Sequence, residues 1–462
     1  MLNNYVGYNM TKLRIMYGIV FLLGTSSLVA AEPQVSVTIY NDDLALVREV
    51  RSIQLDEGVQ EYKFVDVASR IDPTSVHFKS LTDPNSIVLL EQNYEYDLVG
   101  TERLLQKYID QELTATIEEG GTVTGTLLSS TGGDIIVQLE NGQIRALKSE
   151  AVQSVFFPSL PEGLITRPTL VWMLDSQKAG QHESEISYLT SGIQWHAEYV
   201  AVVNETDTQL DLGGWVSIEN NSGTAYENSK IKLVAGDVHR VRQPQPRPMR
   251  NQVYAMSAAK ETAQFEEREF FEYHLYTLQR PATIKNRQIK QLSLFSPQTA
   301  EVEKIYSYDG EYHGKKVNVR LEFKNSKENG LGMPLPRGKV RVYKRDSDDS
   351  QEFIGEDAID HTPKDETLRL TMGSAFDIVG ERTVKDVQQI NKRSRQQTVE
   401  ITLRNHKEQQ VEVLVIEHLY GDWKFVGSTP PVHKKTADRV EFQVQVPADG
   451  ENTFEYTVLF QY

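Results

Sequence analysis

The sequence predicts a mainly β protein, multidomain, built from antiparallel β-sandwich units with a small SH3/Sm-like barrel insert and few short helices. Three observations lead to this fold class. Runs of six to eleven residues rich in Val, Ile, Phe and Tyr recur along the 462-residue chain. Apolar and polar residues alternate within many of these runs, as in strands with one buried face. Gly, Pro, Asn and Asp separate the runs, and the chain is long enough for roughly two to four domains.

Residues 1–31 are predicted to be a secretory signal peptide. Lys12 and Arg14 precede an apolar run at 15–23, and small residues follow as far as Ala31. A basic start, an apolar centre and a small-residue cleavage site are the parts of such a signal. We therefore expect an exported, soluble protein, periplasmic or extracellular. The alternative is an N-terminal membrane anchor, but the apolar run is shorter than the ~20 residues that a span needs.

Composition and charge exclude several classes of function. The chain has no cysteine, which excludes disulfides, thiol nucleophiles, thiolate metal sites and a lipoprotein anchor. The formal charge of −16 becomes −18 once the first 31 residues, with two basic and no acidic side chains, are removed. An acidic surface repels phosphate backbones, so no nucleic-acid partner is expected. The basic cluster of Lys392, Arg393 and Arg395 is interpreted as a solvated loop.

Residues 32–100 are expected to form an N-terminal β domain. Strand-like runs such as VSVTIY at 35–40 and ALVREVRSIQL at 45–55 follow one another at short, regular spacing. Asn-Asp-Asp, Asp-Glu-Gly and Asp-Pro sequences separate them. Such spacing is typical of a β-sandwich or an open barrel.

Residues 101–158 are expected to form a short helix followed by a small SH3- or Sm-like barrel. Thr101 is placed as the cap of a helix whose apolar side carries Leu104, Leu105, Tyr108 and Ile109. Closely spaced strands with Gly-Gly-Asp and Glu-Asn-Gly turns follow it. Barrels of this kind often bind a peptide or a nucleic acid. The alternative, a purely structural insert, is favoured here because the chain is acidic.

Residues 159–241 are expected to form a central β-sandwich region. Trp195, Ala197 and Tyr199 alternate with polar or smaller residues, which indicates a mostly buried strand. The pair Gly213-Gly214 predicts a bulge or a close backbone approach in the next strand. The sequence from 220 to 223, Asn-Asn-Ser-Gly, predicts a turn.

Residues 242–268 are expected to be a flexible Pro/Arg-rich insert. The stretch RVRQPQPRPMRNQ holds three prolines and four arginines, a composition typical of an extended, exposed connection. SAAKETAQFEER follows with good helix formers but no sustained apolar stripe. It predicts a flexible segment or a marginal helix.

Residues 269–462 are expected to form a C-terminal β-sandwich region. FFEYHLYTL, at 270–278, is interpreted as one strand with a largely aromatic face. Clean alternation then recurs at 317–323 and in three later runs, which predicts half-buried antiparallel strands. A weak repeat places an asparagine at the end of three alternating runs, where it would turn the chain as in immunoglobulin-like sandwiches: Asn221, Asn325 and Asn405.

Several long strings resemble a known bacterial family. They include YLTSGIQWHAEYV, GWVSIENNSGTAYENSKIKLVAGDV, EFFEYHLYTL and WKFVGSTPPVHKKTADRVEFQVQVPADGENTFEYTV. In this order they are similar to the family of domain of unknown function 4139 (DUF4139), from about Val35 to the end. The resemblance implies a relation to the C-terminal part of mucoidy-inhibitor-like proteins. It implies no activity and no site residues.

Metal and cofactor chemistry have little support in the sequence. His196 and Glu198 lie on one face of a predicted strand, but two ligands do not make a site. The acidic run Asp346, Asp348 and Asp349 lacks the turn glycine and distal glutamate of a strong calcium site. No phosphate loop, dinucleotide fingerprint or GxSxG elbow is present. We therefore expect no metal site and no cofactor.

A binding role is the function that the sequence favours. A non-catalytic cell-envelope binding or scaffolding protein would present strand edges and the Pro-rich insert to another envelope protein or peptide. The first alternative is an envelope hydrolase of glycan or peptide, with His274 and Glu272 as weak candidates because a neighbouring carboxylate raises an imidazole pKa. The second alternative is a structural envelope component.

Overall fold

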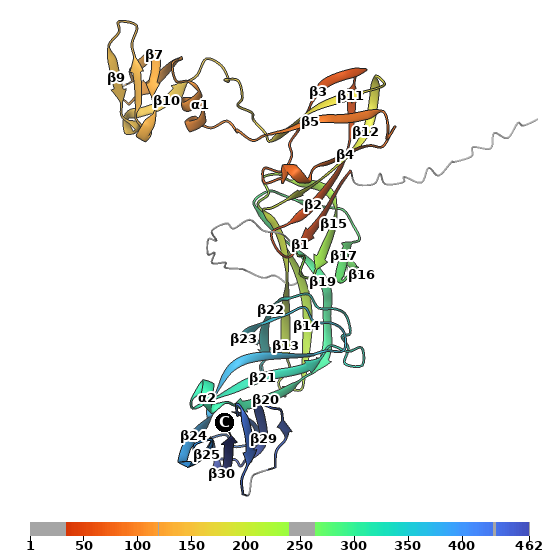
Figure 1. Cartoon of the computed structure of the whole chain (residues 1–462), viewed down its shortest axis with the longest axis vertical. Helices are drawn as coiled ribbons and strands as arrows, with labels where there is room; N and C mark the ends of the chain where they lie inside the picture. Colours follow the sequence, from red (N-terminus) through yellow and green to blue (C-terminus); the bar gives the residue numbers. More distant parts are fainter. Residues whose placement is uncertain (1–33, 119, 240–263, 428–430, 462) are drawn as a thin grey trace, which may run out of the picture.

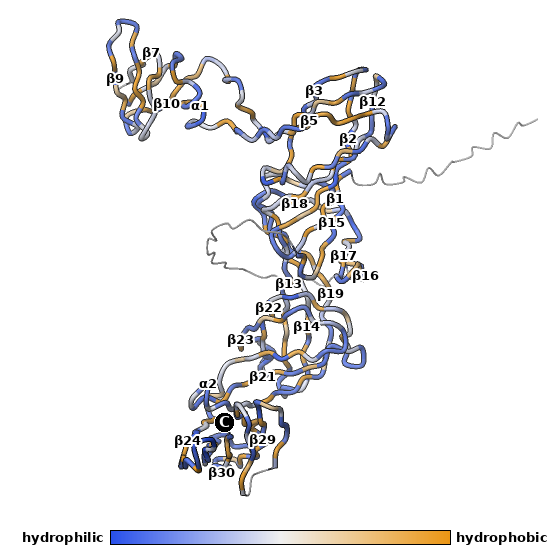
Figure 2. Tube along the Cα trace, in the orientation of Figure 1, coloured by the Kyte–Doolittle hydropathy of each residue, from blue (hydrophilic) through white to orange (hydrophobic). Residues whose placement is uncertain are grey.

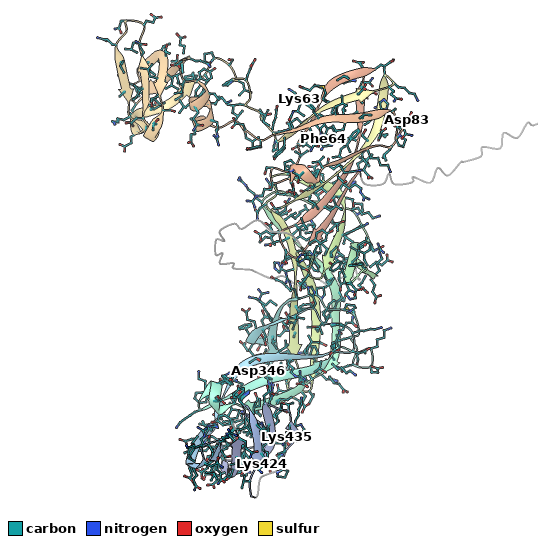
Figure 3. The ribbon with its side chains drawn as sticks, in the orientation of Figure 1. Lys63, Phe64, Asp83, Asp346, Lys424 and Lys435 are labelled. Atoms are coloured by element: carbon teal, nitrogen blue, oxygen red, sulfur yellow. The ribbon has the colours of Figure 1, made fainter. Side chains whose placement is uncertain are left out.

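The computed structural model describes residues 34–118, 120–239, 264–427 and 431–461. Most of it is β-strand, so the mainly β prediction is confirmed. The strands form a long body, and a small five-stranded unit stands off one side of it (Figure 1). Apolar segments recur along the strands of both parts (Figure 2). Lys63 and Asp83 lie at one end of the body, and Lys424 and Lys435 lie at the other (Figure 3).

The first sheet contains eight strands of the described chain. Their order is β16-β17-β15-β1-β2-β12-β4, with β18 paired to β15. The bounds are β1 (Val35–Tyr40), β2 (Ala45–Leu55), β4 (His77–Ser80), β12 (Gly180–Thr190), β15 (Tyr226–Ala235), β16 (Phe265–Phe270), β17 (Tyr273–Leu278) and β18 (Ala282–Ile284). β1 and β2 therefore share a sheet with β12 and β15. Backbone hydrogen bonds thus join strands of the predicted N-terminal region, 32–100, to strands of the central one, 159–241.

Two smaller sheets continue the body. One has the order β3-β11-β5, with β3 (Gly58–Val65), β5 (Ile87–Glu95) and β11 (Thr169–Ser176). The other has the order β19-β14-β13-β22-β23, with β13 (Ile193–Val203), β14 (Gln209–Asn220), β19 (Gln288–Glu301), β22 (Gly338–Arg345) and β23 (Gln351–Ile359). The register between β14 and β19 shifts at Gly214, so the predicted bulge is confirmed. β14 ends at Asn220, which confirms the predicted turn.

The C-terminal sheet contains nine strands of the described chain. Their order is β27-β30-β25-β24-β21-β20-β26-β29-β28. The bounds are β20 (Glu303–Tyr308), β21 (Lys316–Lys324), β24 (Thr367–Asn391), β25 (Ser394–Asn405), β26 (Val411–His418), β27 (Asp422–Phe425), β28 (Lys434–Lys435), β29 (Arg439–Val446) and β30 (Gly450–Gln461), and the one-turn helix α2 (Gly310–His313) joins β20 to β21. The three later alternating runs of the sequence all lie in these strands.

The side unit is a helix followed by an open sheet. α1 (Thr101–Lys107) precedes β6 (Glu112–Ile117), β7 (Thr122–Ser129), β8 (Ile135–Gln138), β9 (Ile144–Leu147) and β10 (Val152–Phe156). The strand order is β10-β6-β7-β8-β9, and β9 does not pair with β10, so the sheet is not a closed barrel. The cap of α1 is the extended Gly100, and Thr101 is its first helical residue, which corrects the predicted threonine cap.

The described chain holds three separate apolar cores. The largest runs through the body from Trp172 of β11, past Trp195 of β13, to Leu370 of β24. The second lies in the C-terminal sandwich under β25, β26, β29 and β30. The third belongs to the side unit alone. β24 contributes Leu370 to the first core and Ile378 to the second, so one strand ties two cores together.

The predicted insert at 242–268 is only partly described, and residues 1–31 lie outside the described chain. The last residues of the predicted insert belong to β16, which pairs with β17 along its whole length. This pairing corrects the expectation of a flexible segment up to residue 268. Phe271, with φ 59°, and Glu272 form the turn between the two strands. The predicted single strand at 270–278 is therefore the end of a hairpin.

Candidate functional site

The histidine chosen from the sequence lies on the β16–β17 hairpin. His274 Nδ1 lies 2.7 Å from Glu267 Oε1, and about a third of each side chain is exposed. Glu267 comes from the neighbouring strand, whereas the predicted partner Glu272 lies in the turn. The sequence pattern could not find Glu267, because it treated the turn as part of one strand. The structure thus gives His274 a carboxylate partner, on a hairpin that is exposed on one side.

Several polar groups near His274 have structural partners, although the buried His361 Nε2 has no partner in the described chain. The backbone N–H of Arg337 donates to His361 Nδ1 at 3.1 Å, and the Arg337 guanidinium binds the Asp42 carboxylate at 2.6 Å. Burial, followed by the charge of Arg337, lowers the pKa of His361. A hydrolase would need a cleft beside its acid or base. A large groove lies on other strands, in the C-terminal sheet.

The predicted metal candidates form ion pairs and turns. His196 Nε2 lies 3.2 Å from Glu198 Oε1, and Arg341 Nη1 donates to Glu198 Oε2 at 3.2 Å. These contacts hold the pKa of Glu198 below its ordinary value, the hydrogen bond with His196 first. Asp346 accepts a hydrogen bond from a neighbouring backbone N–H in a turn. Within the described ranges no group of three or more acidic or histidine side chains is arranged to hold a metal ion.

One long strand edge of the C-terminal sheet has no partner. β24 pairs with β21 up to Val379, and the Gly380 N–H donates to the Lys315 carbonyl at 3.0 Å. Beyond this point β24 pairs with β25 on one side as far as Asn391. Along Glu381–Asn391, no described strand lies on the opposite side. We call this stretch the free edge of β24. A row of unpaired N–H and C=O groups is a template for a further strand.

The free edge borders the second apolar core. Val384 lies opposite Val399, a buried residue of β25, so both side chains point to the core face. Val387 ends a second row on the same face. Yet Val384 is 42% exposed and Val387 is 52% exposed. The core row that contains Val399 thus stops at the open Val384, and the next row, which runs from Val458 through Gln397, stops at the open Val387. One more strand would cover both valines.

A bulge lies within the free edge of β24. The register between β24 and β25 shifts at Lys385, which is the extra residue. Its ammonium lies between two carboxylates on the sheet, 2.8 Å from Glu400 Oε2 and 2.7 Å from Glu455 Oε1. Lysines often protect strand edges against pairing. Here the charge is held over the sheet face by two neighbouring strands.

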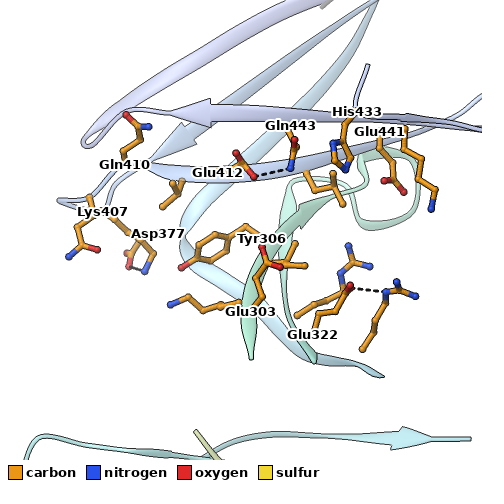
Figure 4. A pocket seen from close by; sticks show the side chains of 18 of the residues that line it. Glu303, Tyr306, Glu322, Asp377, Lys407, Gln410, Glu412, His433, Glu441 and Gln443 are labelled. Atoms are coloured by element: carbon orange, nitrogen blue, oxygen red, sulfur yellow. Dashed lines mark hydrogen bonds and ion pairs between the residues drawn. The ribbon is translucent and has the colours of Figure 1, made fainter. Parts of the chain in front are cut away.

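A large groove lies on the polar side of the same sheet. Its volume is about 1,130 Å³, and β20, β21, β26 and β29 contribute much of its lining. Glu322, Glu441 and His433 lie at one end, and Asp377 and Lys407 lie at the other (Figure 4). Basic and acidic side chains line it in equal number: Lys304, Arg320, Arg369, Lys407, Lys434 and Arg439, with Glu303, Glu322, Asp377, Glu408, Glu412 and Glu441.

Most charged side chains at the His433 end of the groove are paired. Arg369 Nε donates to Glu322 Oε2 at 2.7 Å, and Arg439 Nη2 lies 2.6 Å from Glu441 Oε1. Arg320 differs, because no nitrogen of its guanidinium makes a hydrogen bond or an ion pair with the described chain, and its Nε is buried. Sequence reasoning missed Arg320, which occupies an ordinary polar position of an alternating strand.

A family model described as "Domain of unknown function (DUF4139)" matches residues 184–462, which is more than half of the chain. The matched part contains both the free edge of β24 and the groove. No curated protein matches the chain. Among the described residues, no helix has the length and apolar character needed to cross a bilayer.

Proposed function

The chain belongs to the family defined by this domain of unknown function, and from that premise we propose that it is a non-catalytic binding or scaffolding protein of the cell envelope. It holds an extended segment of another envelope protein by strand addition at the free edge of β24. The observation that carries this proposal is the solvent exposure of Val384 and Val387, whose side chains lie on the core face of the sheet at its free edge. In strand addition, main-chain hydrogen bonds give affinity and pockets for alternate side chains give specificity.

Other sheet edges of the described chain are less suited to this role. β19 is a long edge strand, but it carries Pro297, which cannot donate to a ladder, and two register shifts. β3 and β5 belong to a three-stranded sheet outside the family match. β24 offers a long edge with an apolar row that continues a core. A partner strand there would bury apolar surface as well as pair its backbone.

The envelope location rests on the sequence. The predicted signal peptide at 1–31 supports export to the periplasm or the exterior. A hydrolase is the second candidate, supported by the contact between His274 and Glu267. This pair lies on a partly exposed hairpin and away from the large groove, so binding is favoured over catalysis. A purely structural role would leave the free edge without a partner.

The proposal is tested by site-specific photo-cross-linking in intact cells. A photoreactive residue at 390 of the full chain is expected to give one reproducible adduct, because Ile390 lies on the free edge and is 53% exposed. Val387→Lys in the same chain is expected to weaken that adduct at least about tenfold, since a charge would enter the apolar row.

The control uses a valine of similar exposure elsewhere. Val88 lies on β5 and is 49% exposed. Val88→Lys is expected to leave the adduct unchanged, and circular dichroism of both variants checks that they fold. An adduct that survives Val387→Lys, or falls equally with Val88→Lys, would contradict strand addition at this edge. No adduct at all would favour the structural role.

A further inference from the structure

Arg320 is a charged residue of the groove without a partner. It lies on β21 opposite Ile305 of β20, and its guanidinium makes no hydrogen bond and no ion pair with the described chain. The two carboxylates whose charges act on Arg320 are already bound by other arginines, Glu322 by Arg369 and Glu441 by Arg439. A guanidinium has five N–H donors and stays charged. In the described chain none of those donors has an acceptor.

The surroundings of Arg320 are unfavourable for a lone positive charge. The Nε atoms of Arg320 and Arg439 are both buried and without an acceptor. Burial, followed by the charge of Arg439, lowers the pKa of Arg320, although the charges of Glu322 and Glu441 partly oppose this shift. Burying a charge is costly unless it is paired and hydrogen-bonded. An anion that enters the groove would therefore find the two Nη groups of Arg320, which make no hydrogen bond with the described chain, whereas the buried Nε stays out of its reach.

The charge balance of the groove favours a singly charged anion over a highly charged one as the ligand of Arg320. The six acidic and six basic lining residues cancel, and the whole chain is acidic. A highly charged anion such as a nucleic acid would be repelled by this surface. A single carboxylate matches the planar fork of one guanidinium. Amide side chains lie along the same groove, where Gln443 donates to Glu412 at 3.1 Å and Gln410 is part of the lining. Amides and carboxylates of this kind suit the backbone of a peptide.

We propose that this groove binds a peptide that carries an acidic side chain, with Arg320 as the residue that binds its carboxylate. The peptide would lie along the polar face formed by β20, β21, β26 and β29, with its carboxylate at the His433 end. This site goes beyond the strand addition at β24 and does not depend on it.

Calorimetric titration of two short peptides tests the proposal. Acetyl-Gly-Asp-Gly-amide and acetyl-Gly-Asn-Gly-amide differ in one charge only. The first is expected to bind the full mature chain at least about tenfold more tightly, because a hydrogen bond to a charged group is worth more than a neutral one. Arg320→Gln is expected to abolish the difference. Its melting temperature is expected to stay the same or rise, because the variant loses an unpaired, desolvated charge.

The control is a lysine on the rim of the same groove. Lys434 is exposed on β28, and Lys434→Gln makes the same change in net charge. It is expected to keep most of the preference for the Asp peptide. Equal binding of the two peptides, no binding at about millimolar concentration, or equal losses in the two variants would overturn the proposal. A fall in melting temperature for Arg320→Gln would assign this residue a structural role.

Discussion

A buried charge pair holds the C-terminal sandwich together where β24 enters it. Arg382 Nε donates to both oxygens of Glu417, at 3.2 and 3.1 Å. The hydroxyl of Tyr456 donates to Glu417 as well. Glu417 is 2% exposed, and burial raises its pKa although the charge of Arg382 opposes this shift. The carboxylate is therefore tolerated in the core because of its partners.

Removal of Arg382 is expected to destabilise the fold strongly. Arg382→Leu leaves the Glu417 carboxylate buried with one partner fewer, which costs about 3–5 kcal/mol in comparable pairs. Urea unfolding at neutral pH measures this cost. Arg404→Leu is the control, since Arg404 and its partner Glu381 are both exposed by more than a third. Equal losses in the two variants would contradict a buried role for the Arg382 pair.

The loss in Arg382→Leu is also expected to depend on pH. A carboxyl group whose pKa is raised in the folded state binds a proton more tightly there than when unfolded. Its contribution to stability is full below the ordinary value of 4.5 and is lost as pH rises through the raised pKa. Removal of Arg382 raises that pKa further. The destabilisation should therefore be smaller near pH 4 than at pH 7.

Three buried asparagines show what local sequence can predict. Asn220, Asn325 and Asn405 are each 0% exposed at or just after the end of a strand. Each side-chain amide donates to two loop carbonyl groups, and each Oδ1 accepts a backbone N–H. The repeat predicted Asn325 and Asn405 as turn residues, but it chose Asn221 in place of Asn220. Two adjacent asparagines look alike in a pattern, and only packing decides which amide points inward.

β24 is the element that joins two cores, and its burial changes along its length. Leu370 is 0% exposed in the first core, and Ile378 is 1% exposed in the second. Val384 lies further along and is half open. One continuous strand therefore passes from one sandwich into the next and then becomes an edge.

Alanine substitutions along β24 are expected to separate the two cores. Ile378→Ala and Leu370→Ala should each cost about 2–5 kcal/mol, whereas Val384→Ala should cost less than about 1 kcal/mol. Hydrogen exchange locates the damage. Ile378→Ala is expected to speed exchange in β25, and Leu370→Ala in the 319–324 part of β21. If both variants sped hydrogen exchange equally in both cores, the two sandwiches would form a single cooperative unit, and the prediction would be wrong.

Strands were easier to predict than their partners. The alternation at 317–323 and 399–403 follows from one buried face, and the structure places both runs in strands. Three described pairings are parallel and join distant strands: β1 with β15, β13 with β22 and β20 with β26. These pairings leave no local signal, because the sequence of a strand does not specify which other strand it pairs with. The free edge of β24 and the lone Arg320 follow from such pairings, so the sequence could not show them.

The whole molecule consists of a long body and a side unit with an independent core. The eight buried core residues of the side unit all lie between Tyr108 and Leu147, and none belongs to another core. The entering and leaving segments run side by side, since the Val99 N–H donates to the Ile165 carbonyl at 3.0 Å. The Tyr108 hydroxyl donates to the Ser159 carbonyl at 2.6 Å and closes the unit.

Excision of the side unit is expected to leave the body folded. Replacement of residues 101–160 by a short Gly-Ser linker removes no residue of the main core, so the melting temperature should change by no more than about 4 °C. The excised fragment should unfold cooperatively but with marginal stability, because a domain of about 60 residues buries a smaller share of its surface on folding than a larger domain does. Scanning calorimetry of the variant, the fragment and the full chain checks both outcomes. A large fall in the melting temperature of the variant would mean that the side unit supports the body. If the Ile390 adduct also survives the excision, the side unit has no part in holding the partner at β24.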